Sequence, residues 1–498
     1  MIATARKLIT DGFLHEGIAA YQDAIAAHPN KVEWRMECAQ ILWSNYDIQA
    51  AKKHYATLLT LPLTSPTPHL QAAKQLFDNG AYSETIQHLK KAATLAPTDA
   101  STLTMLAGAY DRNRQYHHAA HAATSALQLN PHHPRAVHIM AKIQRNQNQL
   151  SAAHDLLTHQ LASHQSPDDW RLRYELAKIL DQLGEFENAY TQLTLAKKQL
   201  LPQTTPALQQ SYAIRQRQWE LTKRITISTL KSWQNLTPPS KLIFMAGFPR
   251  SGTSLLESIL QIHPDCHTTD ETGILRSQFI DPIVYQAPDT ASAFDEISHF
   301  DTEQIEDGRK AYFQMTNAWL GKSYTPSHHL IEKDPLLTAD LPLAIRLFPQ
   351  APILMPIRDP RDTILSYFFT MVPLNWNSAP ATTLKESAQF YADTMRHWLH
   401  LKPMLPQASL ESKYEALISR PNETTQTICQ FLQLKWLPEI LSEKERSRQS
   451  VISTPSHHDV TRPLYSNASG RWKNYAQQLD PVLEILDPFI QHFDYPNT

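Results

Sequence analysis

Hydrophobic and polar positions follow a helical spacing through the first two hundred residues, and small residues line one side of most of these stretches. The run AYSETIQHLKKAATLA, at residues 81–96, shows the pattern. Proline cannot continue a helix, and small side chains let two helices approach closely. The pattern therefore predicts successive helix pairs over residues 1–204. A proline follows each stretch, at intervals of 33 to 36 residues: Pro29, Pro62, Pro97, Pro131, Pro167 and Pro202.

This spacing resembles the tetratricopeptide repeat, a helical hairpin with a period of about 34 residues. About six units fit into residues 1–204, and the second and fifth match least well. The resemblance implies an all-α solenoid whose concave face binds a protein or peptide. A scaffold or dimerisation arm without a separate ligand is the alternative, and the sequence names neither a partner nor an oligomeric state.

The pattern changes near residue 240. Residues 205–240 are predicted to form a connecting helix and a linker that ends at Pro238 and Pro239. The next apolar run, LIFMAGF at residues 242–248, is typical of a buried parallel strand, and TSLLESILQIHP follows it with the spacing of a helix. Residues 241–498 are therefore predicted to form an α/β domain.

The turn between this strand and this helix has the chemistry of an anion site. Gly247 and Gly252 let the backbone approach a ligand, and such a turn directs backbone N–H groups and the helix dipole at one point. A nucleoside-triphosphatase loop would have lysine after the second glycine, where this chain has Thr253. ATP or GTP hydrolysis and kinase activity are therefore disfavoured, and a turn without a ligand is the bland alternative. Side-chain donors come from Arg250, Ser251, Thr253 and Ser254.

A second strand-to-helix unit, APILMPIRDPRDTILSYFF, spans residues 351–369. Arg358 ends its apolar run, and Ser366 lies eight residues further on, in the predicted helix. These two side chains could hold another phosphate, although RDPRD could also be a salt-bridge cluster on the surface. Two anion sites in one α/β domain suit a nucleotide with two separated phosphate groups.

The composition of the chain limits the classes of protein and the kinds of ligand that fit the sequence. The chain has 498 residues, enough for two or more domains, and its net charge of -2 gives no sign of nucleic-acid binding. Three distant cysteines, no stretch typical of a signal peptide and no apolar run long enough for a membrane span favour a cytoplasmic protein. His117 and His121 lie one helical turn apart but lack a third ligand at a convincing spacing, so no metal is predicted.

The motifs PRSGTS, RDPRDTILSYF and GRWKNY, in this order behind the repeats, resemble those of the bacterial tetratricopeptide-repeat sulfotransferases. Residues 241–495 are similar to the catalytic half of the tyrosylprotein sulfotransferases. The resemblance implies a parallel sheet flanked by helices, a donor of 3′-phosphoadenosine 5′-phosphosulfate (PAPS), and no metal. It assigns the 3′-phosphate to Arg358 and Ser366. It assigns the 5′-phosphosulfate to a loop like that of phosphate-binding proteins, made of Pro249, Arg250, Ser251, Gly252, Thr253 and Ser254.

The general base is also implied by the resemblance. The stretch HPDCHTTDETGIL matches one in which the second of two adjacent acids takes this role, and that position is Glu271. Asp270, the first acid, departs from the family's glutamate. His263 and His267 are rivals, because related enzymes for small molecules use a histidine base.

The remaining site residues are carried over in the same way. Lys333 is expected to contact the transferring group, and the alternative is an exposed lysine paired with Asp334. Arg471 stands where the tyrosine-modifying enzymes have lysine and keeps the charge. The resemblance places Ser456 near the sulfate, Arg471 and Trp472 near the nucleotide, Tyr414 near its phosphate or base, and Arg462 as a possible further phosphate contact.

These observations predict a helical-repeat solenoid followed by an α/β sulfotransferase domain. The predicted reaction is in-line sulfuryl transfer from PAPS to a hydroxyl or amine acceptor, with protein tyrosine as one candidate. The alternative is a scaffold in which the repeats do the work and the second domain binds a nucleotide without catalysis.

Overall fold

The computed structural model describes residues 1–234, 241–321, 328–371, 374–448 and 469–496. The chain forms two compact units, one of Met1–Gln192 with Gln314–Ser323 and the other of Leu193–Phe313 with Tyr324–Thr498. Each unit has its own core and is described by itself. Among the described helices, none combines the length and apolar character that a membrane span needs.

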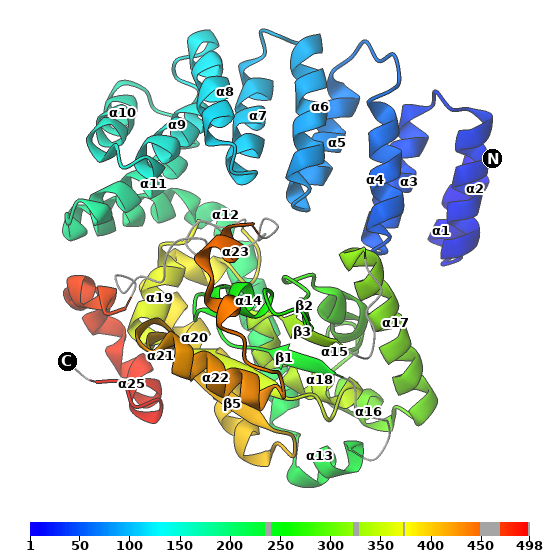
Figure 1. Cartoon of the computed structure of the whole chain (residues 1–498), viewed down its shortest axis with the longest axis vertical. Helices are drawn as coiled ribbons and strands as arrows, with labels where there is room; N and C mark the ends of the chain where they lie inside the picture. Colours follow the sequence, from blue (N-terminus) through cyan, green and yellow to red (C-terminus); the bar gives the residue numbers. More distant parts are fainter. Residues whose placement is uncertain (235–240, 322–327, 372–373, 449–468, 497–498) are drawn as a thin grey trace. The chain divides into compact units, whose positions relative to one another are not determined.

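Helix pairs build the N-terminal unit (Figure 1). Consecutive helices pack against each other, and small residues such as Ala73, Ala107 and Ala123 are fully buried between them. The predicted all-α repeats are therefore confirmed. The helices are α1 (Ile2–Thr10), α2 (Leu14–Ala27), α3 (Val32–Ser44), α4 (Ile48–Leu58), α5 (Thr67–Asp78), α6 (Tyr82–Leu95), α7 (Ala100–Arg112), α8 (Tyr116–Leu129), α9 (Pro134–Asn146), α10 (Leu150–Ser163), α11 (Asp169–Gln182) and α12 (Phe186–Thr222).

The turn inside each pair has one residue with positive φ, a conformation that glycine adopts most easily. These residues recur every 34 positions, and after 36 for the last one. The backbone period is thus the same whether or not the sequence supplies glycine. The six residues are Gly12, Tyr46, Gly80, Arg114, Asn148 and Gly184.

We expect Gly80→Ala to lower the free energy of unfolding of the N-terminal unit by about 1–2 kcal/mol. The φ of Gly80 is +76°, and an added Cβ would meet no atom within 4 Å, so the cost lies in the backbone alone. Gly108→Ala is the matched control, because Gly108 lies within α7 and alanine favours a helix. Thermal unfolding followed by circular dichroism measures both variants. Equal melting temperatures would contradict the expectation.

Pro202 does not end a helix, contrary to the prediction. Helix α12 continues over 37 residues with Pro202 and Pro206 inside it. Near the first of these prolines, the hydroxyls of Thr204 and Thr205 both donate to the carbonyl oxygen of Leu201. The predicted connecting segment therefore begins as the second half of α12. Its end at Pro238 and Pro239 lies outside the described residues.

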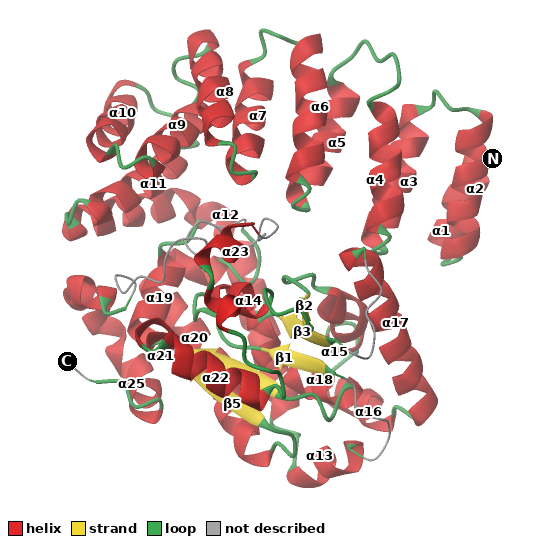
Figure 2. Cartoon of the chain, in the orientation of Figure 1, coloured by secondary structure: helices red, strands yellow, loops and turns green. Residues whose placement is uncertain are grey.

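A five-stranded parallel sheet forms the centre of the C-terminal unit, with helices around it (Figure 2). The strand order is β2-β3-β1-β4-β5. Because the strands are parallel, their carboxyl ends meet at one edge of the sheet, the usual place for ligands in such folds. The predicted α/β domain with a parallel sheet is confirmed. The strands are β1 (Leu242–Met245), β2 (Cys266–Thr268), β3 (His329–Lys333), β4 (Ile353–Ile357) and β5 (Ser409–Lys413).

Side chains of β1 alternate between two packed faces. Ile243 and Met245 join a core with Ile259 and Ile428, whereas the ring of Phe244 packs against other aromatic rings on the opposite face. Both faces are thus closed to water, which explains the continuous apolar run. The α-helices of this unit after α12 are α13 (Ile227–Trp233), α14 (Thr253–Leu260), α15 (Asp281–Val284), α16 (Thr290–His299), α17 (Thr302–Leu320), α18 (Leu341–Leu347), α19 (Pro360–Phe368), α20 (Leu384–Leu401), α21 (Tyr414–Ser419), α22 (Pro421–Phe431), α23 (Glu443–Arg448), α24 (Ala476–Leu479) and α25 (Leu483–His492).

Candidate active site

The loop between β1 and α14 needs glycine at two positions, because both have positive φ and lie close to other residues. Gly252 has φ +100°, and an added Cβ would lie 2.7 Å from the ring of Tyr414. The amide and carbonyl of Gly247 are both bound by the hydroxyl of Thr338, at 2.8 and 2.6 Å. The first turn of α14 follows without a side-chain cap. Backbone donors at this helix start are thus available for an anion.

Arg250 connects the two predicted anion sites. It has a positive φ, and its Nε donates to the Oγ of Ser366 at 3.0 Å. Arg358 approaches from the end of β4, where its Nη1 donates to the carbonyl oxygen of Arg250 at 3.3 Å. The guanidinium of Arg358 also lies 4.9 Å from the ring centre of Tyr414. Residues from three distant stretches of the sequence therefore form one cationic cluster.

The RDPRD stretch is buried, so it is not a surface salt-bridge cluster. Asp359 and Arg361 form an ion pair of 2.7 Å in which both side chains are almost fully covered. Asp362 accepts hydrogen bonds from the backbone N–H groups of Gly470 and Trp472, at 2.6 and 2.7 Å. Burial raises the pKa of Asp362 against these hydrogen bonds. This carboxylate anchors the segment after residue 469 to α19.

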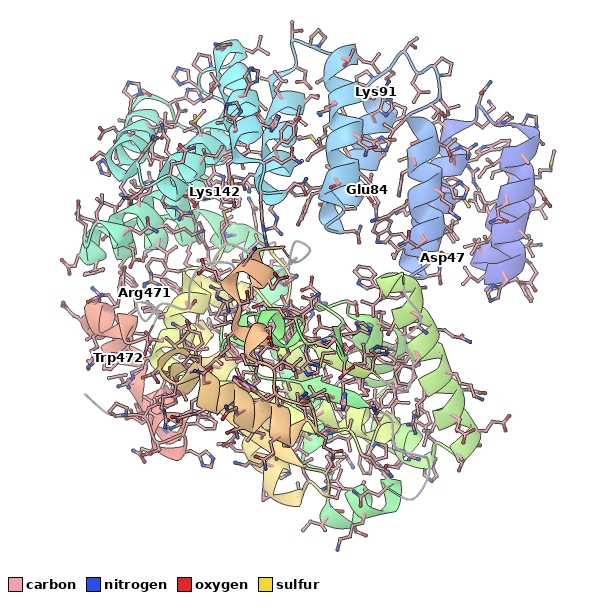
Figure 3. The ribbon with its side chains drawn as sticks, in the orientation of Figure 1. Asp47, Glu84, Lys91, Lys142, Arg471 and Trp472 are labelled. Carbon is pink, nitrogen blue, oxygen red and sulfur yellow. The ribbon has the colours of Figure 1, made fainter. Side chains whose placement is uncertain are left out.

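This anchoring places Arg471 and Trp472, which Figure 3 labels, beside the helix that carries Ser366. The guanidinium of Arg361 lies 3.6 Å from the ring centre of Trp472, and that of Arg471 lies 4.3 Å from the ring centre of Phe369. Both predicted nucleotide contacts thus lie against α19 or the residue that follows it. Ser456 and Arg462 lie outside the described residues.

Lys333, at the carboxyl end of β3, is completely buried among carboxylates. Its Nζ lies 2.6 Å from Glu271, 3.0 Å from Glu257 and 3.8 Å from Asp270. Burial alone would lower the pKa of Lys333, but these carboxylates together raise it, so the side chain is an ammonium at neutral pH. The alternative of an exposed lysine paired with Asp334 is wrong, because Asp334 instead accepts the backbone N–H of Leu336.

Glu271 and Asp270 are the accessible carboxylates of this group, with 34% and 31% of their side chains exposed. Asp270 and Glu271 have φ values of 51° and 56°, a left-handed conformation that costs each residue about 1–3 kcal/mol. Hydrogen bonds hold the strained segment in place, since the N–H of Glu271 donates to the carbonyl oxygen of Lys333. Strained backbone of this kind collects at functional sites. The segment places two partly exposed carboxylates beside one buried cation, and Glu271 is the nearer of the two.

The rival histidines have other contacts. Both ring nitrogens of His263 are engaged, one with the carbonyl oxygen of Lys435 and one with the N–H of Asp265. His263 therefore closes a local turn. The ring of His267 stacks against that of His328 with centres 5.0 Å apart. Within the described ranges, no group of three or more His, Cys, Asp or Glu side chains is arranged to hold a metal ion.

Two buried acids of this site escaped the sequence analysis. Glu257 is a charged residue on the buried face of an otherwise apolar helix, LLESIL, and this mismatch was a usable signal. Asp362 gave a weaker signal, because its partners lie more than a hundred residues away in the chain.

The parallel sheet carries the candidate site residues at its carboxyl edge, the usual place for ligands in α/β folds. Comparison with known proteins identifies the family to which this domain belongs. The model of the sulfotransferase family matches residues 242–438, and a tetratricopeptide repeat model matches residues 140–198. The chain belongs to the sulfotransferase family, and the predicted resemblance is confirmed.

Similar proteins include several that are named protein-tyrosine sulfotransferases. A putative protein-tyrosine sulfotransferase of Caenorhabditis briggsae is 31% identical over 264 residues, which are 52% of this chain and 90% of that protein. Protein-tyrosine sulfotransferase 1 of Danio rerio is 25% identical over 288 residues, 54% of this chain and 78% of that protein. Among solved structures, the sulfotransferase domain of the Synechococcus PCC 7002 olefin synthase matches 51% of this chain and 96% of its own, with 16% identity and a TM-score of 0.33.

Proposed function

We propose that this sulfotransferase moves a sulfuryl group from PAPS to a hydroxyl acceptor, with Glu271 as general base. The observation that carries this proposal is the convergence of the β1 loop, Arg358 and the Glu271–Lys333 pair at one edge of the sheet. PAPS supplies an activated sulfate whose bond to phosphate breaks as the bond to the acceptor oxygen forms.

The residues of the chain suit the two ends of this donor. The glycine-bearing loop from Pro249 to Ser254 offers backbone and hydroxyl donors to the 5′-phosphosulfate. Arg358 and Ser366 suit the 3′-phosphate, because a guanidinium binds phosphate with charged, directed hydrogen bonds. Tyr414 provides aromatic surface beside Arg358, and Trp472 lies against Arg361 on the helix that carries Ser366. The short path from Arg250 to Ser366 fits a ligand whose two anionic groups share one ribose.

Sulfuryl transfer needs a base on the acceptor and positive charge near the departing phosphate oxygen. The exposed carboxylate of Glu271 can take the proton of an acceptor hydroxyl. Lys333 supplies the positive charge, and its burial strengthens its action on a bound anion. The presence of both a candidate base, Glu271, and a candidate cation, Lys333, favours an enzyme over a scaffold with a non-catalytic domain.

The acceptor that we propose is a tyrosine of a protein held by the repeats. The relatives named as protein-tyrosine sulfotransferases and the repeat architecture support this choice. Labelled PAPS incubated with the full chain and a cell extract would identify the acceptor. Label on tyrosine of a protein supports the proposal, whereas label confined to glycans or small metabolites contradicts it.

The test of the donor is titration calorimetry with 3′-phosphoadenosine 5′-phosphate, the product that remains after transfer. We expect saturable binding that needs no added metal, because side-chain cations and backbone donors hold both phosphates. Adenosine 5′-phosphate should bind more weakly, because it leaves Arg358 without an anion. Absence of binding at millimolar nucleotide would refute the proposed function.

A further inference from the structure

Glu257 is a buried carboxylate that the reaction proposed above does not use. Its side chain is 1% exposed, and Oε1 has no hydrogen-bond partner among the described residues. Its Oε2 lies 3.0 Å from the Nζ of Lys333, the contact that makes this pair an ion pair. Removing a carboxylate from water costs several kcal/mol, so burying Glu257 on α14 is unfavourable unless other interactions offset the cost. The cost requires a reason beyond packing.

The sheet order explains how Glu257 meets Lys333. Strand β3 lies between β2 and β1, so the end of β3 is flanked by the segments that follow both neighbours. Glu271 follows β2, and Glu257 lies on α14, which follows β1 and the phosphate-binding loop. The ammonium is thus held from two independent elements. One of them carries the candidate base, and the other begins at the candidate donor site.

The contact of 2.6 Å between Lys333 and Glu271 poses a problem for catalysis. Lys333 must turn toward the departing oxygen of the donor, and Glu271 must be available for the acceptor's proton. If the Asp270–Glu271 segment supplied the only partners of Lys333, turning away from that segment would leave a buried ammonium without a carboxylate. A second carboxylate that does not take part in the proton transfer removes this obstacle.

We propose that Glu257 is a positioning residue for sulfuryl transfer, which keeps the ammonium of Lys333 paired while Lys333 turns from Glu271 to the donor. This inference rests on the proposed function. Glu257 touches neither donor nor acceptor in this scheme and acts only through Lys333. Glu257 exchanges no proton with donor or acceptor, and the acceptor's proton moves to Glu271.

A proton linkage makes the role of Glu257 measurable. Burial raises the pKa of Glu257 to about 7, Lys333 opposes this rise, and the charges of Asp270 and Glu271 add to it. An anion that draws Lys333 toward itself weakens the opposing influence. The pKa of Glu257 then rises further, so the protein takes up a proton when the nucleotide binds. Because this pKa lies near neutral pH, the uptake at pH 7 is less than one proton.

Calorimetry of 3′-phosphoadenosine 5′-phosphate binding, in buffers with different ionisation enthalpies, measures this uptake. We expect the wild-type protein to take up more protons at pH 7 than Glu257→Gln, in which the group cannot titrate. Protons of the nucleotide phosphates contribute equally to both proteins, so the difference reports Glu257. Glu257→Asp should restore part of the uptake. Ser258→Ala, a buried neighbour on α14 that bonds only to its own helix, is the control and should behave as wild type.

Kinetics give the second measurement. These kinetics use the acceptor identified as above. The kcat of Glu257→Gln should fall roughly tenfold, which is less than the rate enhancement that a general base or a stabilising cation supplies directly. The KM for PAPS should not rise, because the substitution removes a negative charge from beside an anionic donor. A purely structural role would instead raise this KM and lower the melting temperature together.

The outcomes separate the two proposals. Wild-type protein that binds no nucleotide refutes the proposed function and this inference with it. Wild-type binding with the same proton uptake in Glu257→Gln overturns the role of Glu257 and leaves the sulfotransferase proposal standing. A variant that loses nucleotide binding and melts early, while Ser258→Ala does neither, also overturns it in favour of a structural role.

Discussion

Replacing Glu271 with glutamine should lower the rate of sulfuryl transfer by at least about 10²-fold, the usual contribution of a general base. The amide has the shape of the carboxylate but cannot accept the acceptor's proton. Binding of 3′-phosphoadenosine 5′-phosphate should remain within about threefold of wild type, less than 1 kcal/mol, because Glu271 lies on the acceptor side of Lys333. Single-turnover transfer from labelled PAPS measures the rate, and calorimetry measures the affinity.

A variant of the rival histidine is the comparison for Glu271→Gln. His267→Asn replaces the rival base, whose ring stacks on His328, and should keep most of the transfer rate. Transfer that survives in Glu271→Gln and disappears in His267→Asn would move the base to the histidine. Loss of both transfer and nucleotide binding in Glu271→Gln would show that the carboxylate supports the fold of the site.

Local sequence was sufficient for the elements that carry the site. A continuous apolar run, a turn with two glycines and a helical run fixed β1, its loop and α14, because each is decided by neighbours in the chain. Lys333 comes after one apolar run and Arg358 ends another. Because the carboxyl ends of parallel strands meet at one edge of a sheet, these two residues could be expected to lie at the same edge. What the pattern could not supply was the order of the strands.

Strand order decides which side chains meet. Because β3 adjoins both β1 and β2, Lys333 receives carboxylates from both sides, and none of these distances follows from sequence spacing. Arg250 likewise meets Ser366 across 116 positions of the chain. Pro202 shows the opposite error, in which a local rule was applied too strictly. Helix α12 continues through this proline, although proline removes a backbone hydrogen bond from a helix interior.

Removing the Arg358 side chain should weaken the binding of 3′-phosphoadenosine 5′-phosphate by about 30- to 1,000-fold. This range corresponds to about 2–4 kcal/mol, typical for the loss of a buried charged partner. Arg358 is 8% exposed, so water cannot replace it at the phosphate. Calorimetry with Arg358→Ala gives the affinity, and Arg420→Ala, which removes an exposed arginine from the same unit, is the control.

Arg358 has a second contact that could imitate this result, since it also donates to the carbonyl oxygen of Arg250 in the phosphosulfate loop. Adenosine 5′-phosphate separates the two roles, because it engages the loop but has no 3′-phosphate. If Arg358 binds the 3′-phosphate, Arg358→Ala weakens only the doubly phosphorylated nucleotide, and the preference of the protein for that nucleotide disappears. Equal losses for both nucleotides would mean that Arg358 shapes the loop. Unchanged affinity for both would remove the 3′-phosphate assignment and leave the second anion site without its main cation.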